Sequence, residues 1–267
     1  MSDLSIKLYV VGGAIRDMIL GKATNDVDFS VVVSDPTSER NIPVEESYAF
    51  MRDWLISQGY KIHLESPEYV TVRVGVPEHL RHPKFPEVRD ADFVLARREG
   101  PYSDGRRPDW VVTGTLEDDL ARRDFTCNAM AMDTNGNIID PHGGRSDLAL
   151  GFLAFVGVPD DRITEDPLRI LRGLRFLIQC DLESHVLDCI LKDKPDHYAK
   201  LLQGVSEERR QVELNKMLKL DQRDALNMLT KDIPVVIYHA IFHGRPRLIV
   251  TRDKYGNLSL EVTLKDA

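Results

Sequence analysis

The sequence predicts an α+β protein in which a mixed or antiparallel sheet with covering helices is followed by a helical region and a short C-terminal hairpin. Strand-like alternation of apolar residues recurs up to about residue 150, helical periodicity prevails to about residue 225, and alternation then returns. Glycine, proline and Asn-Gly turn signals separate the strands. We therefore expect three regions, covering residues 1–150, 151–225 and 226–267.

The composition is that of a globular protein. Hydrophobic residues make up 42% and charged residues 29% of the 267 residues, which excludes a disordered or collagen-like chain. The net charge of −8 means that nucleic-acid binding would depend on local basic clusters. No apolar stretch reaches the roughly 18 residues of a membrane helix, and the beginning of the chain lacks the pattern of a secretory signal. With three cysteines that form no disulfide framework, a cytoplasmic protein without membrane contact is expected.

The first predicted elements are a strand, a glycine turn and a helix. A short buried strand covers residues 8–11, Gly12-Gly13 interrupts it, and apolar side chains recur at helical spacing over residues 14–20. A second strand is expected over residues 26–33, where β-branched residues are frequent.

The elements up to residue 150 complete the sheet and its covering helices. Alternation predicts strands over residues 69–76 and from residue 91, separated by a proline-containing loop. A helix is expected over residues 44–58, and a second begins after the capping signal at Thr115. Asn135-Gly136 predicts a hairpin.

Beyond residue 150, helical periodicity covers residues 165–176, 184–193 and 206–220. Alternation over residues 248–264, with a turn at Gly256-Asn257, predicts the terminal hairpin.

Two carboxylates begin the second predicted strand. Asp26 and Asp28 share one face because side chains alternate along a strand. Upstream, the Gly12-Gly13 turn begins a helix whose amides are suited to a phosphate, with Arg16 supplying charge. Carboxylates beside a phosphate site suit Mg²⁺. The alternative for an isolated Asp-x-Asp is a pair of solvated turn residues.

Asp92 is the best third carboxylate, because it opens a strand predicted to neighbour the Asp26/Asp28 strand. Three acids would repel one another, whereas two metal ions would bridge them, activate an attacking hydroxyl and stabilise a leaving pyrophosphate. The alternative is that Asp92 faces water at a strand edge.

Five segments, matched in order over about residues 10–218, resemble one family. VGGAIRDMILGKATNDVDFSV resembles the signature of polymerase-beta-type nucleotidyltransferases, specifically of the bacterial-type CCA-adding enzyme and poly(A) polymerase family. The other four segments that resemble blocks of this family are LEDDLARRDFTCNAMAMD, IIDPHGGRSDL, EDPLRILRGLRF and SEERRQVELNKML.

The resemblance implies a polymerase-beta-type catalytic head with five strands over residues 1–150 and a helical neck that recognises the nucleotide base over residues 151–225. The sequence departs from the family in its C-terminal region, over residues 226–267, which is expected to be shortened. It implies that Asp26 and Asp28 are metal ligands, and we expect Asp92 to complete a catalytic, metal-binding set that holds two Mg²⁺ ions. The nucleotide-binding residues expected are Gly12, Gly13, Arg16, Arg122, Arg123, Asp124, Asn128, Asp166, Arg169, Arg172 and Arg175.

Two of these groups have structural alternatives. For Arg122, Arg123 and Asp124, which would contact sugar or phosphate groups, the alternative is a surface helix with an internal Arg/Asp salt bridge. Asp166 and Arg169 would read the base, because a carboxylate accepts from the amino group of C or A and a guanidinium donates to the adjacent ring nitrogen. The alternative for their segment is an amphipathic helix with leucines inside and Arg169, Arg172 and Arg175 in a neighbouring stripe.

The expected function is template-independent addition of C and A, from CTP and ATP, to the 3′ end of tRNA with release of pyrophosphate. Poly(A) addition, or addition of only A or only C, is the enzymatic alternative. An RNA-binding module without catalytic activity is the non-enzymatic one. The sequence does not indicate an oligomeric state. Because the C-terminal region is shortened, the sequence also leaves open which RNA is the substrate.

Overall fold

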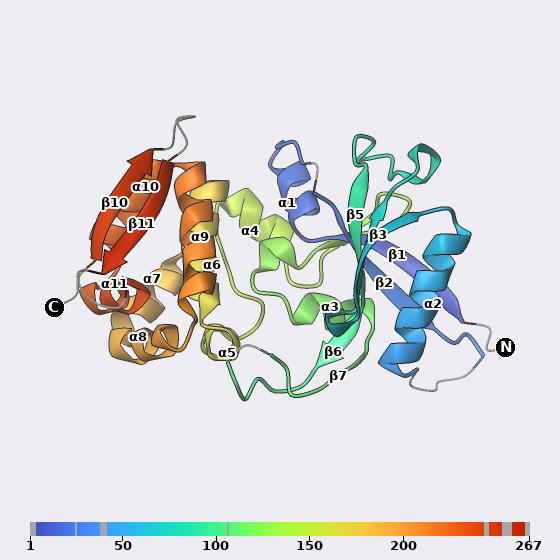
Figure 1. Cartoon of the computed structure of the whole chain (residues 1–267), viewed down its shortest axis with the longest axis horizontal. Coiled ribbons are helices and arrows are strands. Elements are labelled where there is room, and N and C mark those ends of the chain that lie inside the picture. The colour runs from blue at the N-terminus through green and yellow to red at the C-terminus, as the bar shows by residue number, and fades with distance from the viewer. Residues whose placement is uncertain are drawn as a thin grey trace. The chain divides into compact units, whose positions relative to one another are not determined.

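The computed structural model describes residues 4–24, 26–37, 42–105, 107–242, 246–252 and 258–264 (Figure 1). The chain divides into two compact units. The first unit comprises Met1–Pro101 and Pro108–Ala149, and the second comprises Tyr102–Arg107 and Leu150–Ala267. Within the described ranges, no helix combines the length and hydropathy needed to cross a membrane.

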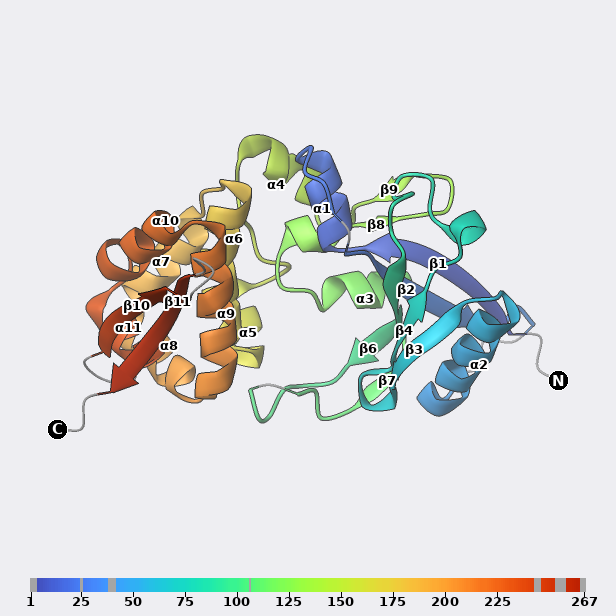
Figure 2. The same cartoon turned by 45° about the horizontal axis from the view of Figure 1, so that its top comes forward.

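The first unit is built on a seven-stranded sheet with the order β3-β4-β5-β2-β1-β8-β9. Strands β2 and β5 are parallel, and the other neighbouring strands are antiparallel, which confirms the predicted mixed sheet. Figure 2 shows β8 and β9 beside β1. The strands are β1 (Ser5–Val11), β2 (Asp28–Ser34), β3 (Lys61–Ser66), β4 (Thr71–Gly75), β5 (Asp90–Leu95), β8 (Ala131–Met132) and β9 (Ile138–Ile139).

The five strands implied by the family resemblance correspond to the five longer ones, β1 to β5. Strands β8 and β9 contain two residues each and extend the sheet beyond β1. Their hairpin was predicted from Asn135-Gly136. Gly136 adopts a φ of 86°, and the Asp133 carboxylate accepts the backbone N–H groups of Asn135 (2.9 Å) and Asn137 (2.8 Å). The turn is therefore stabilised by local hydrogen bonds, as Asx turns are.

Three helices of the first unit, α1, α2 and α3, lie where the sequence predicted them, and α4 was not predicted. A capping box at Thr115 and Asp118 starts α3, so this prediction is confirmed. Met51 and Leu55 form the buried face of α2, which ends just before Gly59 (φ 92°). The helices are α1 (Gly13–Ile19), α2 (Val44–Ser57), α3 (Leu116–Ala121) and α4 (Gly144–Leu150), and β6 (Arg97–Glu99) pairs with β7 (Val111–Thr113) in a separate small sheet.

The second unit is helical up to residue 242. Its central helix, α6, begins after Pro167, whose fixed φ suits the start of a helix. The helix predicted to start at residue 165 therefore starts at residue 168, and residue 165 is the end of a separate helix, α5. The helices are α5 (Pro159–Glu165), α6 (Leu168–Cys180), α7 (His185–Asp193), α8 (Pro195–Gln203), α9 (Glu207–Leu220), α10 (Gln222–Asn227), a π-helix at Met228–Asp232 and α11 (Val235–Phe242).

Two antiparallel strands, β10 (Pro246–Arg252) and β11 (Leu258–Leu264), follow the helices, with Arg252 opposite Leu258. This pairing is the one expected from the alternating apolar residues. The predicted turn at Gly256-Asn257 lies outside the described residues.

Candidate active site

Three carboxylates meet where β2 and β5 begin. In the parallel register of these strands, Asp28 lies directly opposite Asp92. Paired residues in adjacent strands point to the same face, about 5 Å apart along the hydrogen-bonding direction. Asp26 precedes β2, so the strand begins two residues later than predicted, and its side chain is exposed. The pairing therefore brings the three predicted acids to one part of the sheet.

Burial and neighbouring negative charge both raise the pKa values of Asp28 and Asp92. Burial, followed by the negative charges of Asp26 and Asp92, raises the pKa of Asp28 to about 6, while Arg123 and Arg73 act in the opposite direction. Burial also raises the pKa of Asp92, with Arg73 opposing and Asp26 adding to the shift. Ionised carboxylates at this site are therefore destabilised by one another, and a bound cation would remove that conflict.

Arg73 is a neighbour that the sequence interpretation missed. It lies opposite Asp92 in the antiparallel pairing of β4 and β5, and its Nη1 atom is 3.2 Å from Oδ2 of Asp92. The sequence did offer a signal for Arg73, which is the single cationic residue in the alternating apolar segment of residues 69–76. In the absence of a ligand, Arg73 partly neutralises the acid cluster.

The donor set fits a divalent cation that shares its ligands with a substrate. Among the described residues, no three Asp, Glu, His or Cys side chains are grouped closely enough to hold a metal ion by themselves. Mg²⁺ is usually bound by one or two carboxylates together with substrate phosphate oxygens and water. Asp26 and Asp28 can supply the two carboxylates, whereas Asp92 already has an ion-pair partner in Arg73.

The glycine turn before α1 brings backbone close to a guanidinium group. Gly12 has φ 75° and ψ −132°, and its N–H donates to the carbonyl oxygen of Met130 at 3.2 Å. A Cβ atom on Gly12 would lie 2.8 Å from Nη1 of Arg123, and one on Gly13 would lie 3.4 Å from Nη2 of Arg16. Glycine is therefore required at position 12 both by the backbone conformation and by the space available.

A hydrogen-bonded network joins four of the predicted nucleotide-binding residues. Nη1 of Arg16 donates to Oδ1 of Asn128 at 2.7 Å, and Nδ2 of Asn128 donates to Oδ1 of Asp124 at 3.1 Å. Nη1 of Arg123 donates to the backbone carbonyl of Asn128 at 3.3 Å. Arg16 is only 4% exposed and also pairs with Asp17 at 2.7 Å. Arg16 thus connects the glycine turn to the segment after α3.

A buried carboxylate in α3 organises the two arginines that follow it. Asp119 is 1% exposed and forms ion pairs with Arg122 and, at 2.9 Å, with Arg123. Although burial raises the pKa of Asp119, the charges of Arg123 and Arg122 hold it at about 2. Asp119 was not predicted as a site residue from the sequence. It lies three residues before Arg122 and four before Arg123, and this spacing favours ion pairs along a helix. The helix thus contains the internal Arg/Asp salt bridge that was the structural alternative for Arg122 and Arg123, and the carboxylate of this salt bridge is buried rather than on the surface.

In the second unit, each of the two predicted base-reading residues has its own partner. Oδ2 of Asp166 accepts from Nη2 of Arg209 at 2.8 Å, and Oδ1 accepts from the backbone N–H of Leu168 at 3.1 Å. Nη1 of Arg169 donates to Oε2 of Glu165 at 2.8 Å. Arg209, the partner of Asp166, lies in α9 and was not singled out from the sequence.

The arginines that were expected to form a stripe along α6 are largely buried. Arg169 and Arg175 are 7% and 9% exposed, because neighbouring helices cover both of them. Nε of Arg175 lies 2.7 Å from Oε2 of Glu213, and its guanidinium stacks 4.2 Å from the centre of the Phe176 ring. Arg172 is half-buried and lies 5.7 Å from the same ring. These contacts place Arg175 in the packing of α6 against α9.

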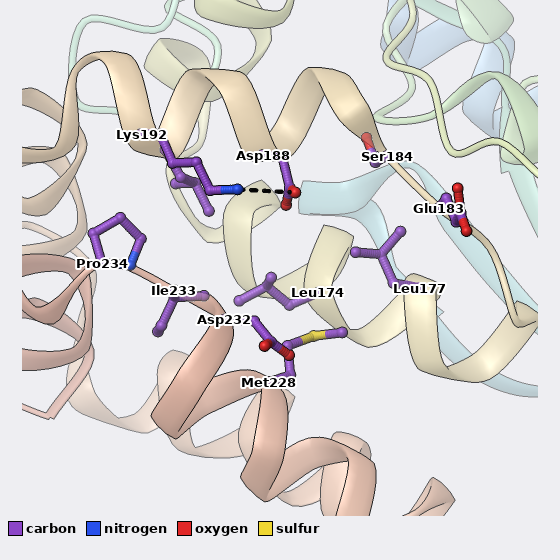
Figure 3. Close-up of a pocket in the computed structure, with 11 residues that line it drawn as sticks. Leu174, Leu177, Glu183, Ser184, Asp188, Lys192, Met228, Asp232, Ile233 and Pro234 are labelled. Carbon is purple, nitrogen blue, oxygen red and sulfur yellow. Dashed lines mark hydrogen bonds and ion pairs between the residues drawn. The ribbon is translucent and has the colours of Figure 1, made fainter.

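The described residues of the second unit line cavities, two of which differ in the character of their lining. Figure 3 shows one of about 360 Å³, whose lining includes apolar side chains such as Leu174 and Met228 and the ion pair between Lys192 and Asp188 (3.3 Å). The other has a volume of about 610 Å³, and Lys200 and Arg209 contribute to its lining.

Comparison with known proteins adds to this geometry. Residues 8–154 match the family model of the poly A polymerase head domain. A CCA-adding enzyme from Bacillus pumilus (strain SAFR-032) is 36% identical over 214 residues, which cover 79% of this chain and 46% of the relative. The chain thus spans about half the length of the curated relatives it matches.

Solved structures give the same relationship. The crystal structure of the Bacillus stearothermophilus CCA-adding enzyme in complex with CTP has a TM-score of 0.63 and 28% identity, and the match covers 85% of this chain and 48% of that one. A tRNA nucleotidyltransferase complexed with a primer tRNA and an incoming ATP analog has a TM-score of 0.56 and 28% identity, covering 84% and 58%. Because the family model spans more than half of the chain and includes the acid cluster and the Gly12 turn, the protein belongs to the family of the poly A polymerase head domain.

Proposed function

We propose that the protein is a template-independent nucleotidyltransferase that adds C and A, from CTP and ATP, to the 3′ end of tRNA and releases pyrophosphate. The observation that carries this proposal is the position of Asp28 opposite Asp92, with Asp26 two residues before Asp28, beside a glycine turn that contacts Arg123. The matched CCA-adding enzymes support the choice of substrate. Together these features suit transfer of a nucleotidyl group to an RNA hydroxyl.

Asp26 and Asp28, with Asp92 as the third acid, would hold divalent cations, which we propose to be two Mg²⁺ ions. Such ions, when bound, would activate the attacking 3′-hydroxyl and stabilise the pyrophosphate that leaves. The fit rests on the burial of Asp28 beside the negative charges of Asp26 and Asp92, which together raise its pKa, and on the preference of Mg²⁺ for carboxylate and phosphate oxygens.

The chain's own cationic groups would bind and orient the nucleotide. Arg123 lies against Gly12, and its charge acts on Asp28, so it is suited to a phosphate or sugar oxygen near the carboxylates. Asp119 fixes the position of that guanidinium before any ligand arrives. Arg16, which is buried, would hold the turn through Asn128. Preorganised charges of this kind reduce the reorganisation needed during reaction.

Asp166 and Arg169 would select C and A. A carboxylate accepts from an exocyclic amino group and a guanidinium donates to a ring nitrogen, a combination that the edges of G and U do not match. Arg209 and Glu165 orient these two side chains through their ion pairs.

Poly(A) addition, or addition of only A or only C, is a second candidate. It is favoured by one specific observation, which is that the matched family model is that of the poly A polymerase head domain; this model ends at residue 154, before Asp166 and Arg169. The choice of nucleotide therefore depends on the part of the chain outside that match.

The two functions are separated by one experiment. The protein is incubated with Mg²⁺, each nucleotide separately, and tRNAs that end before CCA, after the first C or after both Cs, and the products are sequenced. CCA addition predicts C on the first two substrates and a single A on the third. Long A tracts on every substrate would instead establish poly(A) addition, and no extension of any substrate would contradict the proposed function.

We also propose that the protein acts in the cytoplasm. The three cysteines of the sequence follow no disulfide framework, which suits a reducing compartment. Fractionation of cells followed by detection of the protein tests this assignment.

A further inference from the structure

The cavity of about 610 Å³ in the second unit lies against α5, α8 and α9, which are labelled in Figure 1. Tyr102 and Asp104, from the short segment that belongs to this unit, also line it. The volume is large enough for a nucleotide, since small-molecule sites usually measure about 300–1,000 Å³. All the residues that line this cavity belong to the second unit, so Asp26, Asp28 and Asp92 of the first unit take no part in forming it.

Basic side chains from two helices line this cavity. His197 and Lys200 are three residues apart on α8, so they lie on the same face of that helix, and both are exposed. Arg209, from α9, is half-buried and oriented by Asp166. Attraction for an anion comes from these side chains rather than from the start of α9, whose first turn carries two glutamates.

The acidic component of the lining is small. Among the described lining residues, Asp104 is the single carboxylate, and its Oδ1 atom accepts the backbone N–H of Arg107 at 2.6 Å. The cavity of Figure 3 differs, because its lining includes three acidic residues, Glu183, Asp188 and Asp232, and one lysine. Of the two cavities, the one beside Lys200 is suited to a phosphate group.

Stacking and hydrogen-bonding groups accompany the cations. The half-buried ring of Tyr102 lines the cavity, as do the hydroxyl groups of Thr164 and Ser206. Cationic side chains beside an aromatic ring are the usual means of binding single-stranded nucleic acid, with bases stacked on the ring and phosphates near the cations. A protein with a net charge of −8 needs such a local site in order to bind RNA.

We propose that this cavity binds a nucleotide of the single-stranded 3′ end of the RNA substrate, with Lys200 and Arg209 contacting its phosphate and Tyr102 stacking on its base. The proposal rests on the proposed function and extends it by assigning a part of the chain to the RNA. Arg209 would then serve two groups, because it also orients Asp166. His197 and Lys200, by contrast, would contact only the RNA.

The test measures RNA binding directly. A fluorescent single-stranded RNA ending in CC is titrated with wild-type protein and with Lys200→Ala, at several salt concentrations, by anisotropy. We expect Lys200→Ala to weaken binding about 3–10-fold at low salt and to reduce the salt slope by about one. Lys219→Ala, which removes an exposed cation from α9 outside the cavity, should leave both quantities unchanged. Tyr102→Ala should weaken binding about fivefold or more, and Tyr102→Phe should restore it.

Thermal unfolding of each variant verifies that it is folded, and the KM values for CTP and ATP are measured in the same preparations. Unchanged RNA affinity in Lys200→Ala and Tyr102→Ala would overturn the proposal. A raised KM for CTP and ATP with unchanged RNA affinity would also overturn it and assign the cavity to the free nucleotide. If the wild type adds nucleotides while its RNA affinity is independent of Lys200, only this inference fails. If its RNA affinity depends on Lys200 and no nucleotide is added, only the proposed function fails.

Discussion

Gly12 and Arg123 approach each other so closely that a Cβ atom on Gly12 would lie 2.8 Å from Nη1 of Arg123. The same guanidinium is held by Asp119 at 2.9 Å, and its charge lowers the pKa of Asp28 against the effect of burial. Arg123 therefore connects the glycine turn, the buried acid of α3 and the carboxylate cluster. A change at any of these positions is expected to alter the others.

Gly12→Ala should destabilise the protein by about 2–3 kcal/mol, because it adds a steric conflict to a positive φ. Gly21→Ala is a matched control, since Gly21 has φ 68° with no atom within 4 Å of the added Cβ, and about 1 kcal/mol is expected there. Urea unfolding measures both values. Equal losses in the two variants would show that contact with Arg123 has no energetic effect.

Asp26→Asn and Asp28→Asn should each lower nucleotide incorporation at least about 100-fold, because removal of a carboxylate removes charge that holds the cations. Single-turnover incorporation on a matched primer measures the effect. Asp90→Asn, at the start of β5 and exposed, is the control and should retain activity. Turnover near the wild-type rate in both test variants would refute the assignment of these acids.

Asp119 should make stability depend on pH at the acidic end. Its pKa in the folded protein is about 2, below the ordinary 3.8, so it stabilises the fold above pH 3.8 and this contribution is lost as the pH falls toward 2. The loss should amount to about 2 kcal/mol. Unfolding free energies measured between pH 2 and 5 should therefore fall less steeply in Asp119→Asn than in the wild type. Asp53→Asn, which changes an exposed acid, should retain the wild-type slope.

Asp166→Ala and Arg169→Ala should reduce discrimination among ATP, CTP, GTP and UTP about tenfold or more, because each removes one half of the pattern that recognises C and A. Single-turnover incorporation of each nucleotide measures the ratios, and thermal unfolding identifies any loss of structure. Asp161→Ala, an exposed position on α5, should leave the ratios unchanged. Well-folded variants that keep wild-type ratios would assign the pair a structural role.

Arg175→Ala should destabilise the protein by about 3–5 kcal/mol, because it leaves Glu213 buried without its main partner. Glu213 is held ionised by Arg175, which lowers its pKa despite burial. Replacing both residues, with Arg175→Met and Glu213→Leu, should cost less than the single change. Chemical unfolding tests this order. If Arg175→Ala instead raised the KM for nucleotides without loss of stability, its predicted nucleotide-binding role would be favoured.

The sequence by itself determined the local features of this protein. The capping box at Thr115, the hairpin at Asn135-Gly136 and the glycine turn after β1 were all predicted, because each depends on residues within a few positions of one another. Strands of a mixed or antiparallel sheet were also predictable, since apolar alternation records which face of a strand is buried. The motifs also predicted a site at Asp26 and Asp28, and they indicated the family to which the chain belongs.

Only the tertiary structure decided which distant side chains meet. Asp92 lies opposite Asp28 because β5 joins the sheet next to β2 in parallel register, and Arg73 reaches Asp92 from β4. The burial of Arg175 depends likewise on the packing of α6 against α9. Strand register, helix packing and the charges they bring together are set by the burial of surfaces far apart in the chain, and no local pattern of residues specifies them.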